Sequence, residues 1–262
     1  MRNLIVDFNN TVHRARAGFQ RGEHSITYTF MLMLKKMVTT FKPDRVYVVK
    51  EGKAKARREL FSEYKATRTS AGDDFWRQHS NILDLIEHLP VHIIRHPERE
   101  CDDTIAHICR VLNADEECVI ISSDSDFTQL LTRGEDRIKL YNPIKEAYVE
   151  APEYDYVTWK CLVGDGSDNI PGFPGIGPKR AEKIISTQAN LEDFLSQNNN
   201  QEIFDRNMKL IKFEEIESGL ERKEPSKDWD GLKEKFSSFG FNSIISEKSW
   251  VKFVESFSSI GG

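Results

Sequence analysis

The sequence predicts an α/β protein in which helices flank a mostly parallel central sheet. Apolar runs of strand length alternate along the chain with longer segments whose apolar residues recur every three or four positions. That alternation is typical of strand–helix–strand units, which build parallel sheets. The clearest strand, CVIISS at residues 118–123, is rich in Ile and Val, which indicates burial on both faces of the sheet.

The elements before this strand alternate regularly. Residues 3–7 (NLIVD) predict a short strand that ends in Asp7. Residues 26–41 carry Ile, Phe, Met and Leu at helical spacing, so they predict a helix that buries this stripe in the core. The segments that follow show the same two periods and predict a strand at 46–49, a helix at 73–89, a strand at 91–96 and a helix at 102–113.

The elements after it become shorter and then mainly helical. The patterns predict a helix at 127–131, two short strands in a hairpin or edge pair within 137–151, a helix at 153–163, polar helices from 191, a loop running into a helix at 219–235 and a last amphipathic helix at 247–257. We therefore expect a sheet domain at residues 1–152 and a second, helical region at residues 153–262.

The composition indicates a soluble globular chain. Of the 262 residues, 39% are hydrophobic and 30% are charged, which suits one large domain with a helical appendage. We expect no membrane association, because no apolar stretch is long enough to span a bilayer and the chain opens on a strand. The 4 cysteines form no CxxC pair, so a reduced, cytoplasmic location is expected.

Carboxylates gather at both edges of the unit that contains CVIISS. Three precede the helix at 102–113 and two follow the strand, namely Glu100, Asp102, Asp103, Asp124 and Asp126. In α/β sheets, ligand sites form beyond the carboxyl ends of the strands, so both sets share one rim if the strands are parallel. Divalent cations would relieve the repulsion among these charges, and oxygen ligands favour Mg²⁺ or Mn²⁺. Asp7 suits the same metal site, and it equally suits the cap of a following helix.

Residues 50–68 are strongly basic, with 7 Lys or Arg against 3 Glu. Phe61 and Tyr64 lie between the charges, and this mixture is what phosphate contacts with base stacking require. The alternative is a solvated helix face, which is the commoner meaning of a charge run. The position directly after a strand end favours a nucleic-acid contact.

Residues 164–185 (GDGSDNIPGFPGIGPKRAEKII) contain 5 Gly and 3 Pro. Asp165 and Asp168 lie three positions apart, so one helical turn could aim both at a metal ion. The following GFPGIGPK predicts a glycine hairpin and then a helix whose first amides bind phosphate, with Lys179 and Arg180 adding charge. An ordinary Gly/Pro loop is the alternative.

The motifs together resemble the flap endonuclease and 5′-3′ exonuclease family, most closely its bacteriophage ribonuclease H branch. The matching stretches are LIVDFNNTVHRA, ELFSEYKATR, ECDDTIA, VIISSDSDFTQLL, GDGSDNIPGFPGIGPKRAEKII and, more weakly, RNMKLIKFEEI. The resemblance implies a PIN-like sheet domain at residues 1–152 with a basic arch at about 50–75. It also implies a helix-hairpin-helix (helix-three-turn-helix) subdomain within residues 153–262.

The resemblance also assigns roles to residues. Two clusters of metal ligands are implied. The first has Asp7, Glu100, Asp102 and Asp124, with Asp126 bridging toward the second, which has Asp165 and Asp168. Asp103 matches the paired Asp after ECD in the family and is implied as an outer-shell ligand. Basic family positions that contact the scissile phosphate or the 5′ end match Arg14, Lys65 and Arg68. The hairpin that holds duplex phosphates, often around a potassium ion, matches Gly175, Ile176 and Gly177.

One position departs from the family pattern. The family has an Asp after the second strand, commonly followed by Gly, whereas this chain has VYVVKEGK. Aligning Glu51-Gly52 with that pair keeps an acid in place, but an ungapped alignment back from ELFSEYK puts Lys50 there. A slip of one residue along a strand reverses the face of the side chain, so both alignments stay open.

The resemblance implies a structure-specific 5′ nuclease with both exonuclease and flap endonuclease action. Two Mg²⁺ ions, which Mn²⁺ can replace, would straddle the scissile phosphate about 4 Å apart. The implied nucleic-acid partners are branched or nicked DNA with a 5′ flap and RNA–DNA hybrid primers. The implied protein partner is a single-strand-binding protein or clamp at the phage lagging strand. The chain would act as a monomer in the host cytoplasm. Nine acidic residues belong to this candidate site, and without them the chain is mildly basic, which fits a nuclease.

Two rival functions stay open at this point. One is a PIN-like ribonuclease that cuts single-stranded RNA, which shares the first acid cluster but does not need the glycine hairpin. The other is a non-catalytic protein that binds branched DNA, and Lys50 at the ligand position is the feature that supports it.

Overall fold

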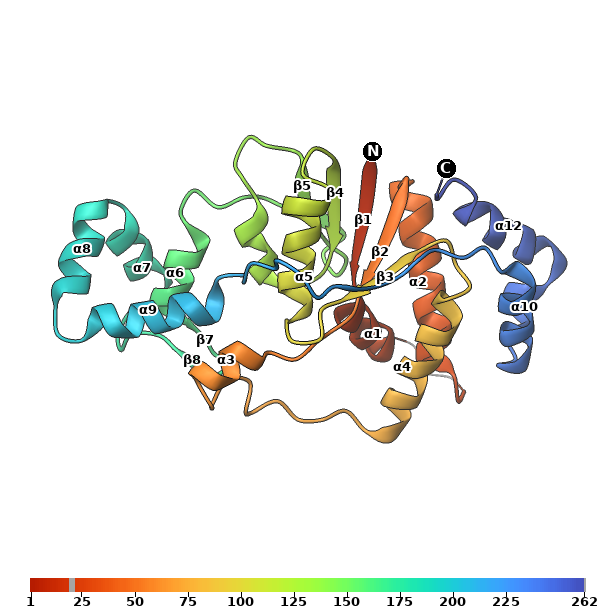
Figure 1. The fold of residues 1–262 in the computed structure, drawn as a ribbon, viewed down its shortest axis with the longest axis horizontal. Helices are drawn as coiled ribbons and strands as arrows, with labels where there is room; N and C mark the ends of the chain where they lie inside the picture. The colour runs from red at the N-terminus through yellow and green to blue at the C-terminus, as the bar shows by residue number, and fades with distance from the viewer. Residues whose placement is uncertain (19–21, 262) are drawn as a thin grey trace.

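The central feature is a seven-stranded sheet in the order β6-β5-β4-β1-β2-β3-β9 (Figure 1). The computed structural model describes residues 1–18 and 22–261. The strands are β1 (Arg2–Asp7), β2 (Arg45–Val49), β3 (His92–Arg95), β4 (Glu117–Ile121), β5 (Ile138–Asn142), β6 (Ala147–Val149) and β9 (Glu221–Lys223). The inner strands β5, β4, β1, β2 and β3 run parallel, whereas β6 and β9 pair antiparallel at the two edges. The predicted mostly parallel α/β sheet is confirmed.

Helices cover both faces of this sheet because successive strand residues point to opposite sides. Val6 and Val48 belong to the core on one face, and Ile5 and Val49 belong to the core on the other. The first core is covered by α1 (Phe8–Ala17), α2 (Ser25–Phe41) and α4 (Asp73–Ile86). The second is covered by α5 (Cys101–His107), the π-helical turn η1 (Ile108–Leu112) and the 3₁₀ helix η2 (Ser125–Leu130). The short α3 (Lys55–Leu60) lies within the basic segment.

The middle of the chain forms a helical unit with its own core. Its elements are α6 (Tyr156–Val163), the two-stranded β7 (Gly164–Asp165) and β8 (Ile170–Pro171), α7 (Pro178–Ile185), α8 (Gln188–Ser196) and α9 (Asn200–Ile211). The helices gather at one end of the molecule, beside the sheet (Figure 1). Ala54 and Tyr64 from the basic segment join this core, so that segment connects the sheet to the helical unit.

The chain then returns to the sheet, which the sequence did not indicate. Residues predicted as a loop contain β9, which pairs with β3 and is supported by an ion pair between Arg95 and Glu221 (2.6 Å). The last helices are α10 (Trp229–Ser238), α11 (Asn242–Ile245) and α12 (Glu247–Phe257). Phe253 and Phe257 are fully buried in the core beneath α2 and α4. A division at residue 152 therefore describes the chain only as far as α9, and residues 221–260 belong spatially to the sheet domain.

Within the described residues, no helix combines the length and the apolar character needed to cross a membrane.

Candidate metal centre and nucleic-acid interface

The carboxyl ends of the parallel strands bring acids from separate segments to one rim. Asp7 ends β1, Glu51 follows β2, Asp102 lies in the first turn of α5 after β3, and Asp124 follows β4. We call these four residues the first acid group. They share one electrostatic environment: Asp124, Asp7 and Glu51 each act on the Asp102 carboxyl. The structure thus brings together the acids that the sequence placed at strand ends.

Burial and mutual repulsion dominate the electrostatics of the first acid group. Burial, with a further contribution from the charge of Asp124, raises the pKa of Asp7 to about 6. Burial and then the charge of Asp124 also raise the pKa of Asp102 well above its ordinary value. Among the described residues, none of these four carboxylates forms an ion pair with a lysine or arginine. The group therefore lacks a directly paired cation, and the more distant charge of Lys65 offsets only part of the rise in the pKa of Glu51 and Asp102.

Asp7 caps a helix and also lies at the acid rim, so both roles that the sequence left open for it are compatible with the structure. Its side chain accepts a hydrogen bond from the backbone N–H of Asn10 (3.1 Å) and so caps α1. The other carboxylate oxygen accepts from the hydroxyl of Ser122 (2.9 Å), just beyond β4. The cap fixes the carboxylate at the rim, so structural and ligand functions do not exclude each other here.

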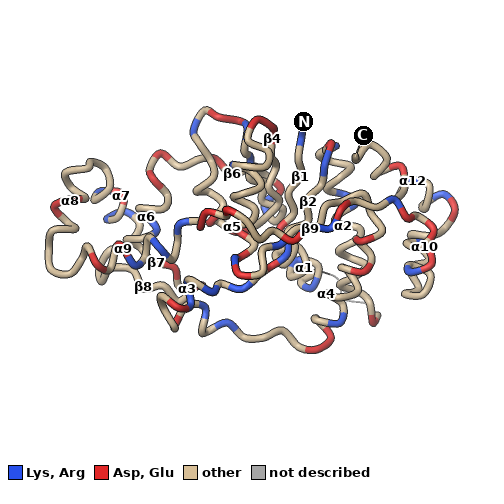
Figure 2. The backbone as a smooth tube through the Cα atoms, viewed as in Figure 1, with Lys and Arg blue, Asp and Glu red and all other residues tan. Residues whose placement is uncertain are grey.

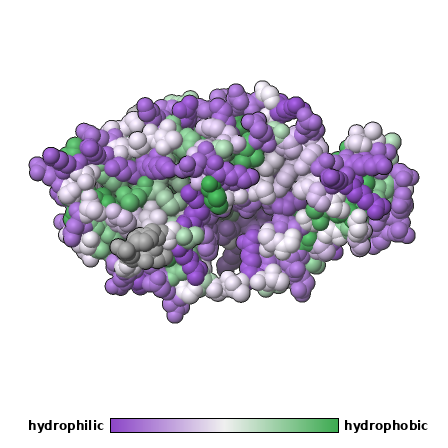
Figure 3. All heavy atoms as spheres, turned by 180° about the vertical axis from the view of Figure 1, so that it is seen from behind, coloured by the Kyte–Doolittle hydropathy of each residue, from purple (hydrophilic) through white to green (hydrophobic). Residues whose placement is uncertain are grey.

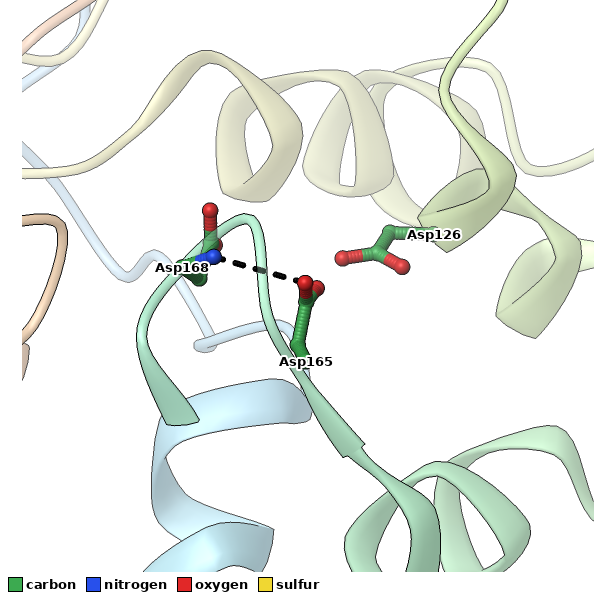
Figure 4. A group of neighbouring side chains, drawn as sticks. All are labelled: Asp126, Asp165 and Asp168. Carbon is green, nitrogen blue, oxygen red and sulfur yellow. Dashed lines mark hydrogen bonds between the residues drawn. The ribbon is translucent and has the colours of Figure 1, made fainter. Parts of the chain in front are cut away.

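A second acid group consists of Asp126, Asp165 and Asp168 (Figure 4). One carboxylate oxygen from each lies within 4.8 Å of the others. Asp126 comes from η2, and the other two come from the β7–β8 hairpin. Their side chains are 10–16% exposed, which leaves a narrow opening to solvent.

The second group differs from the first because basic side chains already occupy it. The ammonium of Lys160 pairs with Asp126 and lies 2.7 Å from Asp165. Arg68 pairs with Asp168, and Lys65 lies 3.5 Å from the same carboxylate. Burial alone would raise the pKa of Asp165, but the hydrogen bonds from Lys160 and Ser167 hold it below its ordinary value. Burial raises the pKa of Asp126 in spite of Lys160.

The spacing of Asp165 and Asp168 comes from a tight hairpin and not from the helical turn that the sequence predicted. β7 and β8 pair antiparallel, and the Asp165 carboxylate accepts backbone N–H groups from Ser167 (2.8 Å) and Asp168 (3.3 Å). Gly164 has φ +83°, and a Cβ on it would lie 2.3 Å from the backbone nitrogen of Gly172. Glycine is therefore required where the two strands approach each other.

A buried network connects the two groups through Glu100. The hydroxyl of Tyr64 donates to Glu100 (2.8 Å) and lies 3.2 Å from an oxygen of Asp168. The ammonium of Lys65 pairs with Glu100 as well as approaching Asp168. Although burial opposes it, the charges of Lys65 and Arg57 hold the pKa of Glu100 below its ordinary value. Glu100 is thus an ionised carboxylate at the border of both groups.

Asp103 has no free oxygen position for a direct metal contact. Its two oxygens accept from both terminal nitrogens of Arg57 (2.7 Å each) and from the backbone N–H groups of Glu100 (3.2 Å) and Glu214 (2.8 Å). These four bonds use its acceptor positions, so Asp103 supports Glu100 through Arg57. The outer-shell part that the resemblance implied for Asp103 is compatible with this geometry and stays a prediction.

Tyr64 is placed differently from the expectation that it stacks on nucleic-acid bases. The ring is only 4% exposed and belongs to the core of the helical unit. A buried phenol needs a partner for its hydroxyl, and here Glu100 and Asp168 provide it. The sequence pattern could not distinguish a stacking aromatic from one that holds two acids in register.

The connection between α3 and α4 crosses below the acid rim (Figure 1). Lys and Arg residues follow one another along α3 and into this connection (Figure 2). From behind, the surface is hollowed into a hydrophilic recess that a strip of chain bounds below (Figure 3). The basic arch expected at about residues 50–75 falls on α3 and on the connection at residues 61–72, which lies along the approach to the acids.

Glu51, and not Lys50, faces the acid rim. Much of the Glu51 residue is exposed, but its carboxylate points inward and accepts the backbone N–H of Cys101 (3.2 Å). Desolvation of this carboxylate, followed by the charge of Glu100, raises its pKa to about 7. Lys50 lies on the other side with Arg95 and Glu221. The next residue, Gly52, lies so close to the neighbouring chain that a Cβ on it would be 1.9 Å from the carbonyl oxygen of His96. This contact fixes the backbone here and with it the opposite directions of the Lys50 and Glu51 side chains.

Arg14 is not brought to the acids. One terminal nitrogen donates to the carbonyl oxygen of Pro143 (3.1 Å), and the other is buried without a hydrogen-bond partner. The guanidinium lines a pocket with Tyr141 and Glu146 on the opposite face of the sheet from α5. The helical turn after Asp7 carries Arg14 around to that face.

The glycine hairpin presents its backbone to solvent next to α7. Gly175 has φ +74°, and Gly177 caps α7 with Pro178 at the first helical position. Ile176 is buried in the helical unit and anchors the turn, whereas Lys179 and Arg180 are exposed. The predicted glycine turn and helix start are present, with their amides and charges accessible.

Two basic residues of the site were not identified from the sequence. Lys160 lies inside the apolar helix α6, and Arg57 lies among six other basic residues of the segment 50–68. A lysine in an otherwise apolar helix five positions before Asp165 was a usable signal for Lys160. Nothing local marked Arg57 as the one that is buried.

Comparisons with known proteins agree with this architecture. Residues 2–158 match the family described as 5′-3′ exonuclease, N-terminal resolvase-like domain, and residues 151–225 match 5′-3′ exonuclease, C-terminal SAM fold. DNA polymerase I of Bacillus subtilis is 31% identical over 211 residues, which are 73% of this chain and 24% of that protein. A 5′-3′ exonuclease of Halalkalibacterium halodurans is 34% identical over 152 residues, 54% of this chain and 50% of that protein.

Solved structures show the same fold at low identity. The bacteriophage T5 D15 protein crystallised with metal ions has a TM-score of 0.65 and 19% identity, with 98% of each chain covered. The catalytic core of Rad2 in complex with DNA substrate has a TM-score of 0.57 and 17% identity, covering 90% of this chain and 86% of that one. The chain spans only about a quarter of the polymerase relative, so the activities of that larger protein are not transferred. The family matches together extend from residue 2 to residue 225, and the chain belongs to the 5′-3′ exonuclease family.

Proposed function

We propose that the chain is a structure-specific 5′ nuclease, with 5′-3′ exonuclease and flap endonuclease action, that hydrolyses phosphodiester bonds with two divalent metal ions. The observation that carries this proposal is the first acid group, which gathers Asp7, Glu51, Asp102 and Asp124 from four segments without a basic partner. A fold does not maintain such repulsion for stability alone, because each buried unpaired charge is costly.

The residues present fit divalent cations. Both acid groups offer carboxylate oxygens only, which are the donors that Mg²⁺ and Mn²⁺ prefer. The first group would hold one ion with support from Glu100, and the second group would hold another through Asp126, Asp165 and Asp168. When bound, such ions would lower the pKa of a nucleophilic water and offset negative charge on the phosphate.

The basic residues of the chain would orient the phosphate between the two groups. Lys65 pairs with Glu100 and lies 3.5 Å from Asp168, so it contacts a carboxylate at the border of both groups, and its ammonium would attract a phosphoryl oxygen placed there. Arg68, whose side chain is 53% exposed, would hold the neighbouring phosphate or the 5′ end. Arg57 and Asp103 would keep Glu100 in position without touching the substrate.

The substrate would be recognised by its structure and not by its base sequence. The exposed residues Gly175 and Gly177, with Lys179 and Arg180, would hold duplex phosphates through their backbone amides and charges, with a potassium ion at the turn. The recess that a strip of chain bounds from below would admit a single 5′ strand. Structural neighbours are complexes of Rad2 with DNA substrate and of T5 D15 flap endonuclease with DNA and metal ions. By resemblance to the phage ribonuclease H branch, the substrates would include RNA primers on the lagging strand.

A magnesium titration on a labelled duplex with a 5′ flap tests this proposal. We expect cleavage that requires Mg²⁺ or Mn²⁺ and leaves 5′-phosphate and 3′-hydroxyl ends. A single-stranded RNA of the same sequence is the comparison substrate. Preferential cutting of that RNA would favour a single-strand ribonuclease, and flap binding without cleavage at any magnesium concentration would favour a DNA-binding protein.

Gly177→Val tests the duplex contact separately. A Cβ at this position meets nothing within 4 Å, so valine should fold normally while its side chain blocks the approach of phosphate. We expect weaker duplex binding and a shallower salt dependence, with an unchanged melting temperature. Unchanged affinity would remove the hairpin from the contact with DNA.

A further inference from the structure

We propose that Trp76 is a stacking platform for a base of the single-stranded 5′ arm as this strand passes from the acid rim to the outer end of the arch. The proposal rests on the proposed function and adds a residue that positions the substrate. It starts from the exposure of Trp76, which is 45% accessible in the first turn of α4 although indole is largely apolar.

The indole is held in place by its own neighbours. Its ring centroid lies 5.2 Å from Phe75 and 5.2 Å from His79, with interplanar angles of 85° and 65°. Both neighbours therefore meet the indole at a steep angle, and no aromatic ring of the described chain lies parallel on it. A fixed ring with no parallel protein partner is what a base requires for stacking.

Cationic groups surround this aromatic cluster. The guanidinium of Arg16 lies 5.5 Å from the centroid of the Phe75 ring, and His13 stacks on the same ring at 4.7 Å. Burial and then the charges of Arg16 and Arg68 lower the pKa of His13, so Arg68 at the arch also lies near it. Two acids, Asp73 and Asp74, also lie in the first turn of α4, and Asp74 is paired with Arg77 (2.5 Å).

A continuous polar path connects Trp76 to the acid rim. His79, which touches the indole, has its ring nitrogen 3.2 Å from the side-chain oxygen of Asn9. The next residue, Asn10, donates to the hydroxyl of Ser123 (2.9 Å), which immediately precedes Asp124 in the first acid group. Trp76 lies in the first turn of α4, directly after the connection formed by residues 61–72, so a strand that leaves the acids along this wall would reach it. Figure 1 shows this connection and the start of α4.

The combination favours single-stranded nucleic acid as the occupant. Stacking on an aromatic ring tolerates every base, and the neighbouring cations suit a phosphate backbone. Such a contact would hold a 5′ arm of any sequence, which is the requirement for a nuclease that recognises structure. A protein segment docked on the indole is the competing explanation, and the experiment below distinguishes it.

The test compares a 5′-flap duplex whose arm carries normal bases with one whose arm is abasic. Binding is measured in Ca²⁺, and cleavage in Mg²⁺, for the wild type and for Trp76→Ala, Trp76→Leu and Trp76→Phe. Stacking contributes about 1–3 kcal/mol per base, so we expect Trp76→Ala and Trp76→Leu to bind the normal flap about tenfold more weakly. Trp76→Phe should stay within about twofold of the wild type, because it keeps an aromatic face.

The abasic flap supplies the decisive comparison. All four proteins should bind the abasic flap with equal affinity. That affinity should be lower than the affinity of the wild type for the normal flap. If the variants lose the same affinity for both flaps, Trp76 has a structural role. If they lose affinity for neither flap, the exposed indole is better explained by contact with a protein partner. Either outcome overturns stacking. Melting temperatures of the variants show whether folding is affected. Absence of flap cleavage by the wild type would overturn the proposed function itself, which is a distinguishable result.

Discussion

In the first acid group, Asp7 and Asp102 lie close to other acids with no lysine or arginine paired to them, whereas in the second group Asp126 and Asp165 share the ammonium of Lys160. Both groups lie along one rim and consist of carboxylates alone. The pKa of Asp102 is raised well above its ordinary value, while that of Asp165 is lowered.

This difference indicates two ways of preparing a metal site. The first group has repulsion that either protonation or an added cation can remove, so near neutral pH it should respond strongly to metal. The second group is already balanced by Lys160, Arg68 and Lys65, so an incoming ion must displace internal cations. We therefore expect the first group to bind metal more tightly and the second to fill later, when substrate phosphates attract these basic side chains away.

The largest effect is expected from breaking the first group with Asp102→Asn. Loss of a charged ligand should reduce flap cleavage on the order of 10³-fold, since metal ions supply several kcal/mol of charge stabilisation. In EDTA the same variant should unfold at a higher temperature than the wild type, because it removes repulsion. Asp165→Asn is the matched isosteric control, and it should lower the melting temperature by weakening the pair with Lys160. Equal shifts in both variants would contradict the comparison.

Lys160→Met should convert the second group into one that resembles the first. The lysine side chain is 9% exposed, so its removal leaves Asp126 and Asp165 buried without their cation and should cost about 3 kcal/mol of the free energy of unfolding in EDTA. Added Mg²⁺ should recover most of that loss, as measured by urea unfolding with and without the ion. Lys179→Met, an exposed lysine of α7, serves as the control and should change neither value. A loss that magnesium does not recover would mean that Lys160 only supports the fold.

The pH dependence of stability should carry the signature of the first group. Asp7 titrates near pH 6 in the folded chain against an ordinary value of 3.8, so its protonated form favours folding. That contribution is complete below about pH 4 and is lost as the pH rises through 6, amounting to about 3 kcal/mol. Urea unfolding in EDTA from pH 4 to 8 should show this loss for the wild type relative to Asp7→Asn, which keeps the helix cap. Saturating Mg²⁺ should abolish the difference in slope, and parallel curves in EDTA would refute the repulsion.

Much of the fold and the first acid group could be predicted because local patterns determine them. The Ile and Val of β4 and the helical spacing in α2 report burial directly, and parallel strands necessarily bring Asp7 and Asp124 to one rim. Strand alternation left Glu51 and Lys50 as alternatives, and only the close contact of Gly52 with the neighbouring chain decides between them.

The internal cations could not be predicted with the same certainty, because pairing depends on three-dimensional contacts. Lys160 and Arg57 look like ordinary basic residues until the helical unit packs against the rim. β9 could not be predicted for a similar reason: its residues are charged and exposed, and its antiparallel backbone pairing with β3 leaves no apolar pattern in the sequence. The basic neighbours of Tyr64 in the sequence predict a contact with nucleic-acid bases. In the structure the side chain is buried, and its hydroxyl donates to Glu100.

The smallest effect is expected from Tyr64→Phe, which removes only the hydroxyl that joins Glu100 to Asp168. Glu100 keeps its bond to Arg57 (2.6 Å), so the carboxylate stays satisfied and the loss should be about 1 kcal/mol of the free energy of unfolding. Tyr156→Phe is the matched control, because its hydroxyl reaches only Asp126 (3.1 Å) and the nearby Ser125. If the Tyr64 hydroxyl couples the two acid groups, Tyr64→Phe should make magnesium binding at one acid group less sensitive to an Asp→Asn change in the other group. A double-mutant cycle measured by calorimetry would show this. Tyr156→Phe should leave that sensitivity unchanged. The same result for both tyrosines would mean that the Tyr64 hydroxyl contributes a buried hydrogen bond but does not couple the two acid groups.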